Sequence, residues 1–197
     1  MYIKLLLSIF LLFSVFTFPV QTQAAETVIQ VEARQMDRRA KIVSAYLEKY
    51  NSPLKPYAQD FVDAADANEM DYKWVVSIAG VESTFGKFVP GGHGPYTSYN
   101  AWGWGVYGDQ ALGFTSWRDG IFTVSKGLKI GYLDKGLTDP YSMNKKYAAS
   151  GAWGWKVDFF MKDLEKFASE YEADIPDTKK DNFNSDTAGK SAQLVLK

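Results

Sequence analysis

The strongest constraint on the fold is an almost unbroken apolar run over residues 74–81, which ends in a single carboxylate, Glu82. Its apolar side chains recur at helical spacing, in stripes that contain Trp74, Val75, Ile78, Ala79 and Val81. A helix that is apolar on most sides is buried inside a domain. We therefore expect a central buried helix over about residues 72–83, with Asp71 as its N-cap.

Other segments show the one-sided apolar spacing of helices that pack on such a centre. These segments cover about residues 33–50, 56–68, 116–132 and 155–172, and Ser116 or the residue before it can cap the third. The last segment is the clearest, because its apolar residues keep strict helical spacing. No segment alternates strongly between apolar and polar residues, so the predicted fold class is mainly α.

Regular spacing disappears between residues 86 and 113. This stretch holds eight glycines, two prolines and six aromatic residues. A long irregular segment inside a compact domain usually serves a function, because glycine lets the backbone approach a ligand and aromatic rings offer flat apolar faces. We expect it to line a cleft. The side chains we expect to stack on sugars are Tyr96, Tyr99, Trp102, Trp104 and Trp153, whereas Trp155 is expected to lie in the core.

The two ends of the sequence differ from its middle. Lys4 precedes an apolar stretch over about residues 5–20, and small residues follow at Ala24 and Ala25. This pattern predicts a signal peptide over residues 1–24, because the stretch is shorter than the ~20 apolar residues of a membrane span. We expect a protein secreted to the periplasm or the cell wall, which meets the membrane only during export.

The remaining chain then divides into three parts. Residues 25–54 form an N-terminal helical extension, 55–173 form the main domain, and 174–197 form a disordered polar tail. The net charge of −1 disfavours nucleic acid as a partner. The chain has no cysteine and its one histidine is His93, so no metal site is expected. We expect a monomer without a cofactor.

Glu82 is the candidate for acid chemistry. It ends an apolar helix and precedes the glycine-rich segment, and burial against apolar groups raises the pKa of a carboxyl group. A carboxyl group with a raised pKa can protonate the leaving oxygen of a glycosidic bond. The alternative is that Glu82 only ends a helix, where the helix dipole disfavours a negative charge.

Four segments carry a resemblance to a known family. Residues 74–86, WVVSIAGVESTFG, resemble the catalytic helix of the lysozyme-like superfamily, in particular its soluble lytic transglycosylases and bacterial glucosaminidases of the mannosyl-glycoprotein endo-β-N-acetylglucosaminidase type. Residues 100–105, 114–121 and 146–150 resemble later segments of these domains, in the same order. The resemblance covers about residues 55–172 and implies a lysozyme-like helical domain that cuts β-1,4 linkages in peptidoglycan glycan strands.

The resemblance also implies roles for single residues. Glu82 is then the catalytic acid, Tyr147 a residue of the cleft that stabilises the transition state, and Ser83 and Asn100 lie near the site. Direct hydrolysis needs a second carboxylate, for which Asp109 is the candidate, although Asp109 also fits a turn after a glycine. Attack by the substrate's own acetamido group needs none and leaves an anhydro end.

Two rival functions differ from a glycosidase in the residues that they require. A glycan-binding module of the same fold that has lost catalysis would keep the cleft and its aromatic residues. An amidase acting on the peptide stem would need zinc ligands or a nucleophilic cysteine, and the sequence provides neither. The choice between hydrolysis and the anhydro-forming reaction, and the choice of sugar linkage, stay open at this level.

Overall fold

The computed structural model describes residues 36–105 and 112–173, which fall in the same structural unit. The signal peptide predicted over residues 1–24, the tail predicted over 174–197, and Asp109 all lie outside the described residues. No helix in the described part is long and apolar enough to cross a membrane.

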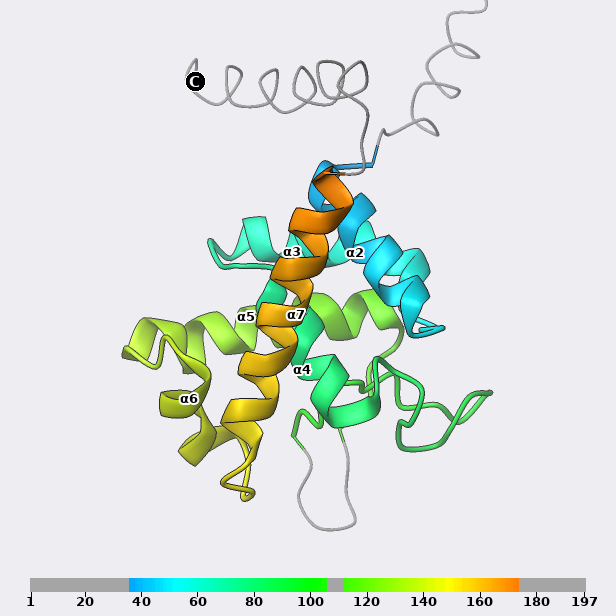
Figure 1. Cartoon of the computed structure of the whole chain (residues 1–197). Helices are drawn as coiled ribbons and strands as arrows, with labels where there is room; N and C mark the ends of the chain where they lie inside the picture. The colour runs from blue at the N-terminus through cyan, green and yellow to red at the C-terminus, as the bar shows by residue number, and fades with distance from the viewer. Residues whose placement is uncertain (1–35, 106–111, 174–197) are drawn as a thin grey trace, which may run out of the picture. The chain divides into compact units, whose positions relative to one another are not determined.

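The described residues form helices joined by irregular segments, without a strand (Figure 1). In chain order these are α2 (Arg38–Lys49), the 3-10 helix η1 (Lys55–Tyr57), α3 (Ala58–Ala67), α4 (Lys73–Ser83), α5 (Trp117–Gly131), the 3-10 helix η2 (Leu133–Lys135), α6 (Pro140–Tyr147) and α7 (Trp153–Ala173). The predicted mainly α class is confirmed.

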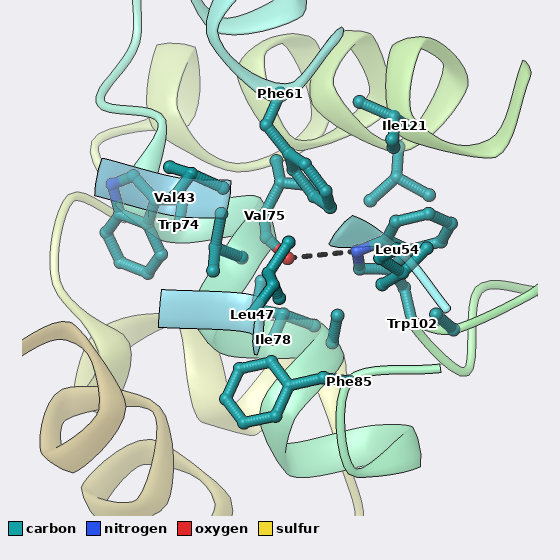
Figure 2. Close-up of a cluster of buried hydrophobic side chains, with 14 of the residues drawn as sticks. Val43, Leu47, Leu54, Phe61, Trp74, Val75, Ile78, Phe85, Trp102 and Ile121 are labelled. Atoms are coloured by element: carbon teal, nitrogen blue, oxygen red, sulfur yellow. Dashed lines mark hydrogen bonds between the residues drawn. The ribbon is translucent and has the colours of Figure 1, made fainter. Parts of the chain in front are cut away.

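Helix α4 lies at the centre of the unit. Eight of its eleven residues are buried, as the apolar run predicts. It packs along α7, while α6 contacts α7, and α3 contacts both α2 and α5 (Figure 1). The core around α4 is shown in Figure 2 and includes Val43, Leu47, Leu54, Phe61, Trp74, Val75, Ile78, Phe85, Trp102 and Ile121.

Most helix boundaries follow from capping side chains. Asp37 accepts a hydrogen bond from the second residue of α2, so this helix begins at residue 38 rather than at 33. Ser116 caps α5 through the backbone N–H of Asp119, as expected. Helix α4 begins one residue later than expected, and the N-cap is Tyr72, while Asp71 accepts from the N–H of residue 73.

The described part of the N-terminal extension shares the core of the main domain. Val43, Leu47 and Leu54 are fully buried in that core. On α2, the Tyr46 hydroxyl donates to Asp163 of α7 at 2.8 Å, and the Tyr50 hydroxyl donates to the same carboxylate at 3.0 Å. Helix α2 therefore supports α7, which lies along the helix that carries Glu82.

Candidate active site

Glu82 lies in the last turn of α4, next to a tight change in chain direction. Thr84, Phe85 and Gly86 all have left-handed backbone angles, with φ of 51°, 57° and 81°. The N–H of Phe85 closes the helix by donating to the carbonyl of Ala79 at 2.9 Å. Two consecutive non-glycine residues in this region are strained, and such strain persists where surrounding contacts hold it.

The Ser83 side chain is one of those contacts. Its hydroxyl oxygen accepts from the N–H of Gly86 at 2.7 Å and lies 2.8 Å from the carbonyl oxygen of Ala101. Ser83 is 3% exposed, so its hydroxyl is used inside the protein. Ser83, which was predicted to lie near the substrate, uses its hydroxyl to hold the turn after α4 against the segment that contains Ala101.

The two oxygens of the Glu82 carboxyl have different neighbours. Oε1 accepts a hydrogen bond of 2.6 Å from the indole Nε1 of Trp153, at the start of α7. Oε2 lies beside Gly103, where an added Cβ would come within 2.9 Å of it. The close approach requires a residue without a side chain, and Gly103 also has a φ of 59°, which favours glycine.

Glu82 as a whole residue is exposed, but its carboxyl group is partly shielded from water by these neighbours. This loss of hydration raises the pKa of the carboxyl group. The hydrogen bond from Trp153 and the positive charge of Lys156 act in the opposite direction, and burial outweighs both. The site thus contains an accessible carboxylic acid that holds its proton to a higher pH than an ordinary glutamic acid.

An aromatic cluster, defined as Trp104, Tyr132, Tyr147 and Trp153, adjoins the Glu82 carboxyl. The rings of Tyr147 and Trp153 are stacked, with centroids 4.4 Å apart and planes inclined by 19°. Trp104 and Tyr132 contact the ring of Tyr147 at centroid distances of 6.0 and 5.8 Å. The cluster joins α6, α7 and the irregular segment around one side of the acid.

Tyr147 connects this cluster to the backbone beside Gly103. Its hydroxyl donates to the carbonyl of Trp102 at 2.7 Å. Burial and the nearby negative charge of Glu82 raise the pKa of the Tyr147 phenol well above its usual value. Tyr147 therefore stays a neutral hydrogen-bond donor, and it lies close enough to the acid to sense the charge of Glu82.

Asn100 shapes the segment that carries Gly103. Its side-chain nitrogen donates to the carbonyls of Trp104 and Leu112, and its side-chain oxygen accepts from the N–H groups of Trp102 and Trp104. The residue is 2% exposed. Asn100, which was predicted to lie near the substrate, has both polar atoms of its side chain bonded to the backbone of the loop.

Two solved structures have a fold similar to that of this chain. One is a catalytic mutant of S. aureus autolysin E in complex with the disaccharide NAG-NAM, 20% identical, with a TM-score of 0.57 over 66% of this chain and 67% of that chain. The other is S. aureus autolysin E in complex with the muropeptide NAM-L-Ala-D-iGlu, 19% identical, with a TM-score of 0.53 over the same shares. The fold is lysozyme-like.

This lysozyme-like assignment rests on structure, since no protein-family model and no curated protein matches the sequence. The predicted lysozyme-like, mainly α fold is confirmed. The buried helix ending in Glu82 and Ser83, on which the predicted resemblance chiefly depended, is α4.

The residues predicted to stack on sugars differ in how far their side chains are buried. Trp102 is fully buried, and its indole N–H donates to the carbonyl of Val75 at 2.9 Å (Figure 2). Trp153 is 3% exposed. Both were predicted to stack on sugars, and in this structure both side chains are buried. Trp155, expected in the core, is 53% exposed on α7.

The other predicted stacking residues lie nearer the surface. Trp104 is half-buried in the aromatic cluster, and Tyr99 is half-buried with its ring edge-on to Trp117 at 5.3 Å. Tyr96 is 86% exposed in the irregular segment. Of the predicted residues, the structure brings together Glu82, Tyr147, Trp104 and Trp153.

Sequence reasoning missed three residues of the site. Gly103 contacts the acid, Lys156 lowers its pKa, and Tyr132 belongs to the aromatic cluster. The signal for Gly103 was its place between two tryptophans outside any helix. Among the described residues, no group of three or more His, Asp or Glu side chains is arranged to hold a metal ion.

Proposed function

We propose that this protein is a peptidoglycan glycosidase that cleaves the β-1,4 linkages of N-acetylated glycan strands, with Glu82 as its general acid. The observation that carries the proposal is the Glu82 carboxyl, which is accessible from solvent yet held by Trp153 and Gly103. The solved structures with the same fold support it. Autolysin E binds a NAG-NAM disaccharide, and its catalytic mutant replaces a glutamate by alanine.

The chemistry begins with a proton on Glu82. Because burial raises its pKa, the carboxyl group stays protonated at a pH where most glutamates are ionised. The proton moves to the glycosidic oxygen as the bond from that oxygen to the anomeric carbon breaks, and the bonding electron pair stays on the oxygen. Glu82 is left as a carboxylate, which the N–H of Trp153 and the charge of Lys156 stabilise.

The anomeric carbon is then captured in one of two ways. Water adds in hydrolysis and gives a reducing end, whereas internal attack within the sugar gives an anhydro end. Asp109 is the proposed base for direct hydrolysis, and the internal route needs no second carboxylate. Mass spectrometry of the released fragments separates the two routes, because the products differ by one water.

The test compares wild type with Glu82→Gln on suspensions of purified cell wall. We expect wild type to clear the suspension and Glu82→Gln to lose that activity by several orders of magnitude, because an amide cannot donate the catalytic proton. Glu170→Gln is the matched control, since Glu170 is an exposed glutamate on α7. Circular dichroism verifies that all three proteins are folded.

Two outcomes would contradict this proposal. Full activity of Glu82→Gln would remove Glu82 from the mechanism. Binding of wild type to insoluble peptidoglycan, without release of any fragment, would instead identify a glycan-binding module with the same fold.

A further inference from the structure

Trp153 contacts Glu82 through its indole N–H, whereas a sugar-binding tryptophan offers a free ring face. Its ring is 3% exposed and stacked on Tyr147, so neither of its faces is free for a sugar. Its single polar group, the indole N–H, points to Oε1 of Glu82 at 2.6 Å. Trp153 therefore interacts with the Glu82 carboxyl group, and its ring is not available to a sugar.

An indole N–H can donate a hydrogen bond but cannot accept one. A protonated carboxyl group has one carbonyl oxygen and one hydroxyl oxygen, and the carbonyl oxygen is the better acceptor. With the indole donating to Oε1, the proton of the acid belongs on Oε2. That oxygen lies beside Gly103, an exposed residue with no side chain.

We propose that Trp153 is the positioning residue of the general acid: its N–H holds Oε1, so the transferable proton sits on Oε2 and the glycosidic oxygen approaches over Gly103. This inference rests on the proposed function. On this inference, the hydrogen bond from the buried Trp153 determines which carboxyl oxygen delivers the proton. The substrate then enters from the side of Gly103.

The same contact stabilises the product of proton transfer. When Oε2 gives up its proton, Glu82 becomes a carboxylate, and hydrogen bonds to ionised acceptors are stronger than those to neutral ones. The bond from Trp153 therefore strengthens as the reaction proceeds, which lowers the barrier rather than only tightening binding.

Trp153 is held in place for this role. Its ring stacks on Tyr147, and the Tyr147 hydroxyl donates to the carbonyl of Trp102, the residue that precedes Gly103. The two oxygens of Glu82 are thus located by one connected set of contacts, with Trp153 on Oε1 and the Gly103 backbone beside Oε2.

The first test does not depend on activity. In a nuclear magnetic resonance titration of the intact protein, the indole N–H signal of Trp153 should shift with pH, with a midpoint above the ordinary pKa of glutamate. The other groups that face Glu82 are the positively charged Lys156 and the Tyr147 phenol, whose pKa is raised well above its usual value. The shift should therefore vanish in Glu82→Gln.

The second test uses Trp153→Phe, which keeps an aromatic ring for stacking and removes the N–H. We expect kcat to fall about tenfold or more, KM to stay within about twofold, and the alkaline limb of the pH profile to move to higher pH. Trp155→Phe is the matched control, because Trp155 is 53% exposed on the same helix; it should change none of these quantities.

The outcomes separate the two proposals. An indole signal of wild type that does not respond to pH would overturn the role of Trp153, as would a Trp153→Phe variant with raised KM and unchanged kcat. If Trp153→Phe fails to fold, the titration of wild type decides. Inactive wild type with a pH-dependent indole signal would overturn the glycosidase proposal, and the contact between Trp153 and Glu82 would still stand.

Discussion

Ser52 donates its side-chain hydroxyl to the backbone carbonyl of Phe85 at 2.7 Å, across 33 residues of sequence. The same oxygen accepts from the N–H of Leu54 at 3.0 Å. Phe85 is one of the left-handed residues that follow Glu82, so this buried contact links the segment after α2 to the turn that ends α4, the helix that carries Glu82.

Ser52→Ala should destabilise the protein by about 1–3 kcal/mol, because it leaves a buried carbonyl and a buried N–H without their partner. Ser169→Ala is the control, since its hydroxyl donates to a carbonyl within the exposed face of α7, and it should stay within about 0.5 kcal/mol of wild type. Urea unfolding monitored by tryptophan fluorescence measures both. Equal stability of the two variants would refute the role given to Ser52.

Gly80→Ala should also be destabilising, although alanine favours helices. A Cβ at Gly80 would lie 2.7 Å from the ring of Phe85, which is fully buried and cannot move aside. We expect overpacking to exceed the ~1 kcal/mol gain in helix propensity and to leave a net loss of about 1–2 kcal/mol.

The control for that substitution is Gly131→Ala at the end of α5, where the nearest atom to an added Cβ is the Lys146 Nζ at 4.0 Å. This variant should be as stable as wild type or more stable, by up to about 1 kcal/mol. Thermal unfolding of both proteins checks the pair. A stabilised Gly80→Ala would mean that the Phe85 ring does not close against α4.

Gly103→Ala should reduce activity with a modest effect on stability. Its Cβ would come within 2.9 Å of the Glu82 Oε2, so the acid must shift, and small displacements of catalytic groups lower rates by about 100-fold. The left-handed backbone of Gly103 adds a strain of about 1–2 kcal/mol.

Gly136→Ala separates these two effects. Gly136 has a φ of 79° and open space around it, so the same substitution imposes the same kind of backbone strain far from any contact with Glu82. Both variants should lose similar stability, and only Gly103→Ala should lose wall-clearing activity. A comparable loss of activity in both would trace the effect to strain alone.

Glu82→Gln should change how stability depends on pH. The folded-state pKa of Glu82 is raised, so above the pKa of the unfolded chain the unfolded state ionises more readily than the folded state. The Glu82 carboxyl therefore contributes a destabilisation that is absent below the unfolded pKa of about 4.3 and grows as pH rises through the folded pKa.

The variant should consequently be more stable than wild type at neutral pH, and the two should converge in acid. Denaturant unfolding at several pH values measures this difference. If the stability of Glu82→Gln relative to wild type instead increased as pH falls, the pKa of Glu82 would be lowered in the folded state. That result would contradict its role as an acid at neutral pH.

The helix that carries Glu82, the cap at Ser116 and the all-helical class could be predicted, because each depends on residues within a few positions of one another. A helix that is apolar on most sides is buried whichever elements pack against it. A serine before a helix accepts a hydrogen bond from a free N–H within the first turn. The direction of the Glu82 pKa shift also agrees with the sequence-based expectation, although the carboxyl group is shielded by the distant Trp153 as well as by the nearby Gly103.

Tertiary structure alone decided which tryptophans line the site and which fill the core. Trp102 was buried by a contact with Val75, 27 residues away, and Trp153 reached Glu82 across 71 residues. In the sequence, both lie in nearly identical Trp-Gly-Trp elements. No apolar periodicity around these elements predicts whether either ring is buried or exposed. Local spacing sets which face of a helix is apolar, but the environment of a residue in a loop or at the first position of a helix depends on which distant elements fold against it.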